Sequence, residues 1–242
     1  MITLLSTRGG DYAAACALDF SSKPEIYYDT FALRDSTGHQ TATQTYPYFR
    51  SSSSITSLLH NVPIPVQSCW NGIISMDTSP FYSSPPLSFR GVPDSLANLH
   101  IEGSECCLIH ADNDALRREK GVWVNPNVRV AYNASTYGKV NPGVVVKADI
   151  TEEVHGFELP GGVRGKWPSK SEAWRGRWSN RKARWIGWAK EWSERRVVNS
   201  RVERWIRQGK KKDEGIEERE EVGRECLVNE MQVLFQNGWQ HL

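Results

Sequence analysis

The alternation of apolar and polar positions predicts a mixed α/β chain. Residues 12–18 form an apolar run that follows two glycines and ends at Asp19, which is typical of a buried strand in a parallel-type sheet. Residues 51–59 begin with a capping serine and are predicted to form a helix. Residues 122–124 and 128–132 alternate like two strands around a turn at 125–127.

The region between these elements is harder to assign. Residues 77–93 are rich in proline and serine and are predicted to form a loop, after which residues 94–97 open a short helix. Ser104 could cap a helix over 105–111, although the apolar run at 106–109 fits a strand nearly as well.

The C-terminal third has a different pattern. Residues 166–212 contain 16 basic and 4 acidic residues, with five tryptophans on one helical face: Trp174, Trp178, Trp185, Trp188 and Trp192. We expect this tryptophan face to pack on the core, with the arginine face in solvent. Contact with an anionic membrane surface is the next alternative, followed by single-stranded nucleic acid. Residues 214–225 are predicted to form a charged, solvated helix.

Composition sets wide bounds. The chain has 242 residues, 39% hydrophobic and 10% aromatic, which fits a globular protein and excludes a disordered one. The net charge of +2 is uneven, since residues 1–165 hold 12 basic and 16 acidic residues, and residues 166–242 hold 18 and 12. No signal peptide and no apolar run of about twenty residues is evident, so a transmembrane helix is not expected.

The five cysteines, at positions 16, 69, 106, 107 and 226, include no Cys-x-x-Cys pair, so a structural zinc site is not expected. We expect a few buried thiols, with one long-range disulfide between Cys69 and one of the adjacent pair. The sequon at Asn133 is compatible with a secretory lumen.

The densest chemistry lies at residues 100–113, where acids and histidines surround an apolar Cys-Cys-Leu-Ile run. Buried acids are costly unless they are paired or bind a cation, so this stretch is either a functional site or a surface loop beside a core segment.

Four further motifs occur along the chain with that stretch. They are Tyr-Asp-Thr-Phe-Ala-Leu-Arg-Asp at 28–35, Ser-Cys-Trp-Asn-Gly at 68–72, Asn-Pro-Asn-Val-Arg-Val at 125–130, and the end of the chain from Cys226 to His241. Together they resemble the cryptococcal mannosyltransferase family, the fungal capsule-associated α-1,3-mannosyltransferases. The resemblance is weak between about residues 150 and 222.

The resemblance implies a GT-A-like, Rossmann-like nucleotide-sugar transferase domain. We expect its core at residues 1–150, a variable basic and tryptophan-rich helical segment at 151–222, and a C-terminal segment at 223–242 that packs back on the core. Family members resemble type II Golgi membrane proteins with an N-terminal anchor. This chain shows no such anchor and is expected to be truncated at its N-terminus, with the first strands and the principal metal-binding Asp before residue 2.

The implied reaction moves mannose from GDP-mannose to the 3-hydroxyl of a mannose-containing glycan acceptor, with retention of configuration and with Mn²⁺ or Mg²⁺ at the diphosphate. No nucleic acid is expected as a partner. The alternatives are a non-catalytic remnant or glycan-binding module of the same family and, from another class, a basic protein that binds nucleic acid or a membrane surface.

Glu105 is the first choice for the acceptor-side carboxylate, with Glu102 as the alternate. The competing interpretation of Glu105 is a helix N-terminal acid favoured by the dipole. His110 and His241 are candidate metal ligands, although a lone histidine is more often a satisfied core residue.

The remaining candidates would contact substrate. Trp70, Asn71 and Gly72 would form a loop near the donor or acceptor, unless Trp70 is a core residue. Arg34 and Asp35 would hold phosphate or sugar, or form a structural salt bridge. Asp112 and Asn113 would bind sugar hydroxyls or the metal, or form a local turn.

Overall fold

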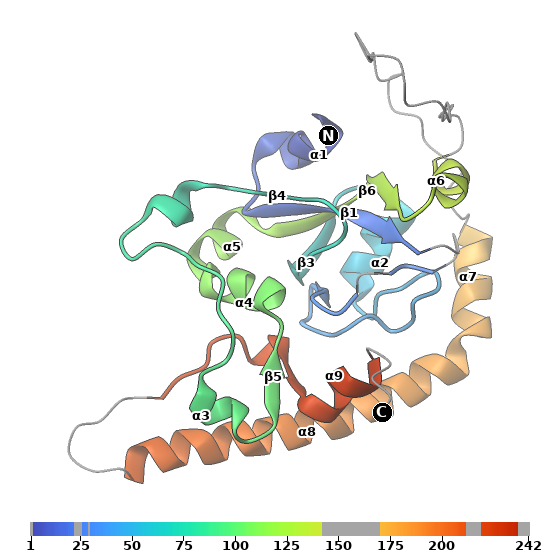
Figure 1. Cartoon of the computed structure of the whole chain (residues 1–242). Helices are drawn as coiled ribbons and strands as arrows, with labels where there is room; N and C mark the ends of the chain where they lie inside the picture. The colour runs from blue at the N-terminus through green and yellow to red at the C-terminus, as the bar shows by residue number, and fades with distance from the viewer. Residues whose placement is uncertain (1, 22–25, 29, 142–169, 212–218, 237–242) are drawn as a thin grey trace.

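The structure is a computed structural model, which describes residues 2–21, 26–28, 30–141, 170–211 and 219–236. Its centre is a five-stranded sheet in the order β2-β3-β6-β1-β4. The strands are β1 (Ala14–Phe20), β2 (Arg34–Asp35), β3 (Ile64–Ser68), β4 (Ile74–Met76) and β6 (Val122–Ala131). Among them only β1 and β6 pair in parallel (Figure 1). The α/β class is therefore confirmed, in the form of a mixed sheet.

β1 is buried along its whole length, as its apolar run predicts. Its partner β6 is one continuous strand and not two strands around a turn. The predicted turn is instead an irregularity in the pairing, because Cys16 pairs with Val124 and Leu18 already pairs with Arg129. The residues between Val124 and Arg129 bulge out of the ladder, which accommodates Pro126 without a ladder hydrogen bond.

The main core lies on the sheet under α2 (Ser52–Leu59). The helix begins as predicted, because the hydroxyl of Ser51 accepts a hydrogen bond from the backbone N–H of Ser54. Ile55 and Leu58 then face the sheet. A short helix, α1 (Ile2–Leu5), packs at the start of β1, and α6 (Ala134–Val140) follows β6.

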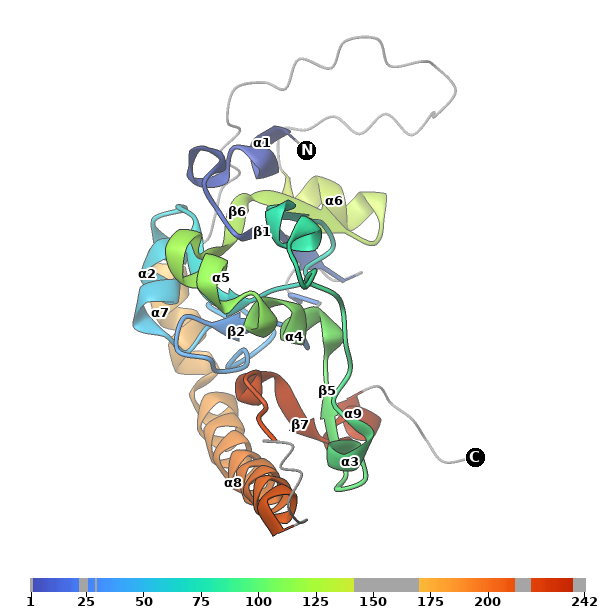
Figure 2. The ribbon, with the colours of Figure 1, turned by 90° about the vertical axis from the view of Figure 1, so that its left-hand side faces the viewer.

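A second layer joins distant parts of the chain. Residues 105–112 form a helix, α4 (Glu105–Asp112), and not a strand, and α5 (Asp114–Lys120) follows it. Nearby, β5 (Ile101–Gly103) pairs with β7 (Leu227–Asn229) from the C-terminal region, beside α3 (Asp94–Ala97) and α9 (Glu230–Gln236) (Figure 2). The predicted loop at 77–93 contains a 3₁₀ turn, Ser79–Tyr82.

Two disulfides form, one within the central sheet and one within the second layer, and neither is the one expected. Cys16 bonds to Cys69, and Cys107 bonds to Cys226. The predicted partner of Cys69 is wrong because β1 and β3 both pair with β6, which brings Cys69 at the end of β3 to Cys16 on β1, a proximity that sequence separation does not reveal.

The basic segment is helical as predicted, in α7 (Lys170–Ser179) and α8 (Arg181–Lys211), and α8 runs along the side of the molecule that carries α3 and β7 (Figure 1). The expected direction of its tryptophan face is wrong, because all five side chains are between 54% and 73% exposed. The opposite side faces the core: a Cβ atom on Gly176 would lie 2.5 Å from the carbonyl oxygen of Tyr46. Further along α8, Val198, Val202 and Trp205 are buried.

The predicted helix over 214–225 is also wrong in its described part. Residues 219–223 are irregular, and Arg224–Cys226 form a 3₁₀ turn that leads into β7. Within the residues that the structure describes, no helix is long and apolar enough to cross a bilayer.

Candidate functional site

Asp19 lies at the carboxyl end of the parallel pair β1 and β6, the edge at which α/β sheets bind ligands. The residue is 2% exposed, and its Oδ2 atom has no hydrogen-bond partner among the described residues. Burial raises the pKa of Asp19 to about 6, against a smaller lowering by the backbone N–H of Phe20. A buried carboxylate oxygen without a partner is costly, so a ligand or cation at this point would stabilise it.

Gly72 lies directly against Asp19. Its φ angle is +61°, and an added Cβ atom would lie 2.4 Å from Cγ2 of Val130 and 3.3 Å from Cγ of Asp19. Only glycine permits this conformation and this approach. The neighbouring Asn71 is buried, and its carbonyl accepts a hydrogen bond from the backbone N–H of Ile73. The structure thus brings Asn71 and Gly72 of the predicted loop to the end of β1.

Two exposed tyrosines flank the same edge. The backbone N–H of Tyr28 donates to the carbonyl of Asp19, and that of Tyr132 donates to the carbonyl of Phe20. Their rings meet edge to face with centroids 4.9 Å apart, and the residues are 50% and 66% exposed. Exposed aromatic faces beside a buried carboxylate offer a surface on which a sugar ring can stack.

Trp70, the first residue of the predicted loop, is partly buried against the cluster that contains the Cys107–Cys226 disulfide. Its ring meets Phe89 edge to face at 5.5 Å. The indole therefore helps to hold the 77–93 loop on the second layer.

Arg34 and Asp35 lie on β2, at the far edge of the sheet. Asp35 accepts five hydrogen bonds, four of them from the backbone N–H groups of residues 37, 39, 50 and 51 and one from the Thr37 hydroxyl. These contacts make Asp35 an organiser of two turns. The Arg34 guanidinium is buried and donates to the carbonyls of Phe31, Leu33 and Glu225.

Glu102 and Glu105 are both exposed, on β5 and at the start of α4. Neither is fixed by an ion pair or hydrogen bond to another described residue. Their catalytic role stays a prediction.

Asp112 and Asn113 end α4. Asp112 receives two hydrogen bonds from Arg90, at 2.7 and 2.8 Å, and Arg90 donates two more to Glu221, at 2.8 and 3.0 Å. Both carboxylates hold the pKa of Arg90 above its usual range. This network ties the 77–93 loop to α4 and to the C-terminal region. Asn113 joins α4 to α5, with its carbonyl accepting from the N–H of Arg117.

His110 is buried in α4, and its Nε2 atom lies 2.9 Å from the carbonyl oxygen of Cys69. Burial lowers its pKa to about 4, so the ring is neutral at physiological pH and Nε2–H donates to that carbonyl. This is the environment of a satisfied core histidine. His241 lies outside the described residues.

The family resemblance implies a divalent cation. No cluster of three or more His, Cys, Asp or Glu side chains suited to a metal ion occurs among the described residues. A cation at a nucleotide diphosphate is commonly held by one or two carboxylates together with the phosphates. The unpartnered Oδ2 of Asp19 fits that requirement, and Asp19 is the residue that would hold the ion.

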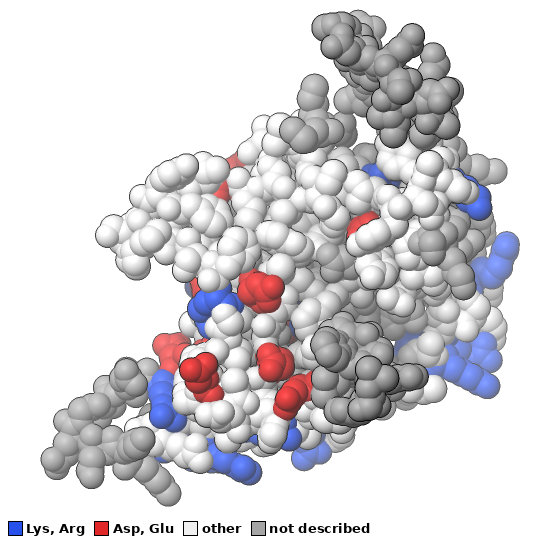
Figure 3. Space-filling view, in the orientation of Figure 1, with Lys and Arg blue, Asp and Glu red and all other residues white. Residues whose placement is uncertain are grey.

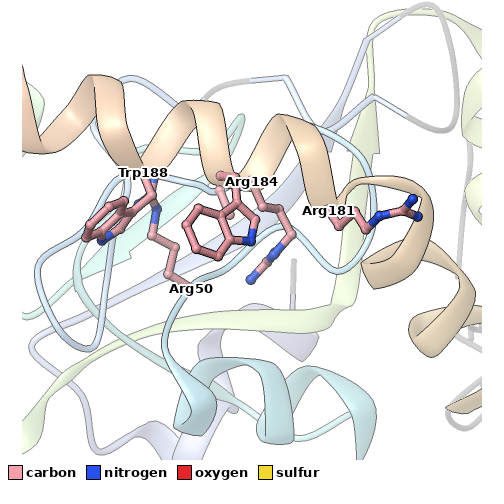
Figure 4. Close-up of a pocket in the computed structure, with 6 residues that line it drawn as sticks. Arg50, Arg181, Arg184 and Trp188 are labelled. Carbon is pink, nitrogen blue, oxygen red and sulfur yellow. The ribbon is translucent and has the colours of Figure 1, made fainter.

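A groove with different chemistry lies between α8 and the 42–50 segment. Its cavity of about 430 Å³ is lined by Ala42, Arg50, Arg181, Arg184, Trp185 and Trp188. Arg50 reaches toward α8 beside Trp188 (Figure 4). Lys and Arg gather along the border formed by α7 and α8, away from the β1 edge (Figure 3).

Asp19 and the two tyrosines were missed from the sequence. The available signal was an acidic residue near the end of an otherwise apolar strand. An unpaired charge in such a position is rarely structural. The contact with Gly72 could not be found, because it depends on the pairing of β1 with its neighbours.

The fold and this edge define an α/β protein with a buried acid where such sheets bind ligands. Residues 1–112 match the family described as Cryptococcal mannosyltransferase 1, which includes β1, the 68–72 loop and α4. The resemblance is thereby confirmed for this range, and this part of the chain is similar to a family of mannosyltransferases. The motifs at 125–130 and 226–241 lie beyond the match. No curated protein and no solved structure matches the chain.

Proposed function

We propose that the protein is a mannosyltransferase that moves mannose from GDP-mannose to the 3-hydroxyl of an acceptor mannose with retention of configuration, in a GT-A-like domain. The observation that carries the proposal is Asp19. It is a buried carboxylate whose Oδ2 atom has no partner among the described residues, held against Gly72 at the carboxyl end of β1, inside the range that matches the family.

The reaction breaks the bond between the mannose C1 atom and the diphosphate and forms a bond from C1 to the acceptor oxygen. The hydroxyl proton leaves with GDP. Above pH 6 the Asp19 carboxylate is ionised and supplies negative charge where positive charge develops on the donor side. Mn²⁺ or Mg²⁺ would neutralise the leaving diphosphate. Tyr28 and Tyr132 would stack on a sugar ring at the entrance.

The setting of the reaction is proposed as the lumen of the secretory pathway, in keeping with the family. The two disulfides support this setting, because such bonds persist in oxidising compartments.

The experiment is a transfer assay with labelled GDP-mannose, a mannobiose acceptor and Mn²⁺. The wild type is compared with Asp19→Asn, Glu105→Gln and the control Glu119→Gln, an exposed acid on α5. We expect Asp19→Asn to lower kcat by about 10²–10³-fold, as the loss of one transition-state electrostatic contact does, and Glu119→Gln to leave it unchanged. Wild-type rates in Asp19→Asn would remove Asp19 from the mechanism.

Glu105 is tested in the same assay. A loss of rate in Glu105→Gln would place the acceptor-side carboxylate at the start of α4. The exposed tyrosine pair also suits a glycan-binding module without transfer. Acceptor binding with no turnover in the wild type, with or without Mn²⁺ or Mg²⁺, would favour that second function.

A further inference from the structure

A second cavity, of about 350 Å³, lies between β2, α8 and the β7–α9 region. None of the residues at the β1 edge lines it. Its walls come from three separate parts of the chain: Arg34 and Gln40, then residues 191–199 of α8, then residues 224–232. Its size is at the lower end of the range of about 300–1,000 Å³ for small-molecule pockets, which suits one small ligand.

Arg34 carries the strongest sign that this cavity binds something. Its Nε and Nη1 atoms donate to three backbone carbonyls, so the guanidinium is held in one orientation. Its Nη2 atom is buried and has no hydrogen-bond partner among the described residues. Burial, together with the nearby charge of Arg195, lowers the pKa of Arg34 to about 10, so it stays protonated. A buried charged donor without an acceptor is costly, and the residue that carries it lines this cavity.

The charges on the other walls are already balanced. Glu191 accepts a hydrogen bond from His39 at 3.0 Å and forms ion pairs with Arg50, at 3.0 Å, and with Arg195, at 3.2 Å. Glu225 is paired with Arg117 at 3.0 Å, and Arg224 with Glu203 at 2.8 Å. The lining therefore holds three arginines and three glutamates. A phosphate or carboxylate at Arg34 would face these glutamates, so a strongly charged anion fits poorly.

Groups that both donate and accept hydrogen bonds fit this lining well. A hydroxyl oxygen can accept a hydrogen bond from Arg34 while its O–H group donates one to a glutamate oxygen. The amides of Gln40, Asn199 and Gln232 add donors and acceptors on the same walls. Val198, Leu227 and Val228 supply an apolar patch for the C–H face of a ring.

We propose that this cavity is a binding site for a neutral saccharide unit, with Arg34 as a charged donor in its wall. The existence of the site does not depend on the proposed transfer reaction. The expectation that the sugar is mannose rests on the proposed function.

The test is isothermal titration calorimetry of the full chain with methyl α-mannopyranoside, methyl α-glucopyranoside and inorganic phosphate. The variants Asn199→Leu and Gln232→Leu remove wall amides without touching the backbone contacts of Arg34. Arg204→Gln, an exposed residue of α8 that does not line the cavity, is the control. Arg34→Lys keeps the charge and removes the Nη2 donor.

We expect at least one glycoside to bind, and each amide variant and Arg34→Lys to weaken binding about tenfold or more, equivalent to about 1.4 kcal/mol. Arg204→Gln should bind as the wild type does. Because Arg34→Lys also changes backbone contacts, the two amide variants decide the outcome if its melting temperature falls.

Three results would overturn the proposal. The first is no glycoside binding at concentrations up to about 50 mM, which is well above the millimolar range of weak complexes. The second is wild-type affinity in both amide variants, and the third is binding of phosphate alone. Binding of the glucoside but not the mannoside would support the saccharide site and count against the proposed function. Retention of this binding in Asp19→Asn would show that the site is independent of the β1 edge.

Discussion

Gly72 lies so close to Asp19 that a Cβ atom at position 72 would be 3.3 Å from the Asp19 carboxyl carbon. The glycine forms the wall against which the buried acid is held. The shape of the candidate site is thus determined by a residue that carries no side chain.

Gly72→Ala is expected to lower the free energy of unfolding by about 2 kcal/mol or more. The positive φ angle costs about 1–2 kcal/mol for a residue with a Cβ atom, and the clash with Val130 adds to that cost. The measurement is urea unfolding. The matched control is Gly138→Ala in α6, where no atom lies within 4 Å of the added Cβ, so a gain of up to about 1 kcal/mol is expected. Equal stability of the two variants would contradict the packing described here.

Asp19 should make stability depend on pH. Its folded pKa of about 6 is above its ordinary value of 3.8, so the folded state binds more protons than the unfolded state between these values. Its contribution is therefore fully present below pH 3.8 and is lost as the pH rises through 6. Unfolding curves at several pH values should show the wild type losing stability relative to Asp19→Asn over this window. Parallel profiles for the two proteins would refute the raised pKa.

The contact between Arg90 and Glu221 predicts a large mutational effect. Arg90→Met leaves the carboxylate of Glu221, whose side chain is 1% exposed, without its cationic partner. Breaking a buried pair in this way costs about 3–5 kcal/mol. Arg118→Met is the control, because Arg118 is 80% exposed and its pair with Asp114 is a surface pair. Thermal unfolding should separate the two variants clearly, and similar melting temperatures would argue against the network.

The two glycines on the core-facing side of the basic helices should respond in opposite ways. A Cβ atom at Gly176 would lie 2.5 Å from the Tyr46 carbonyl oxygen, whereas at Gly187 the nearest atoms are at 3.5 and 3.6 Å. Gly176→Ala should therefore loosen the attachment of α7, and Gly187→Ala should stabilise α8 by about 0.5–1 kcal/mol. Hydrogen exchange of the helix amides would report both effects. Faster exchange in Gly187→Ala than in Gly176→Ala would reverse the assignment of the inner face.

Elements with a strong local signal were predictable from the sequence. The apolar run before Asp19 and the serine cap before Ser52 specify β1 and α2 through short-range preferences. The orientation of the tryptophan face was not predictable in the same way. A helical period shows which residues share a face, but the side that turns inward is decided by contacts with other segments, here at Gly176 and Gly187.

The residues of the candidate site also differ in whether a local sequence feature or a contact with a distant segment defines them. Asn71 and Gly72 were predicted as substrate contacts because the Trp-Asn-Gly motif resembles the family, and the structure places Gly72 against Asp19. Asp19 was missed because its importance comes from the neighbours that the sheet brings to it. For Asp112 and Asp35 the sequence left open a substrate contact or a structural role. Both have protein partners supplied by residues distant in the sequence, Arg90 and the 50–51 backbone.

The Cys107–Cys226 bond joins the end of the family-matched range to the C-terminal region across 119 positions. A protease that cleaved anywhere between these two cysteines would leave two fragments still tied together, and they would separate on a gel only after reduction. A shortened version that stopped at residue 112 would lose the partner strand of β5 as well as that covalent tie. The range that matches the family therefore depends on the C-terminal region for a covalent link and for the strand that pairs with β5.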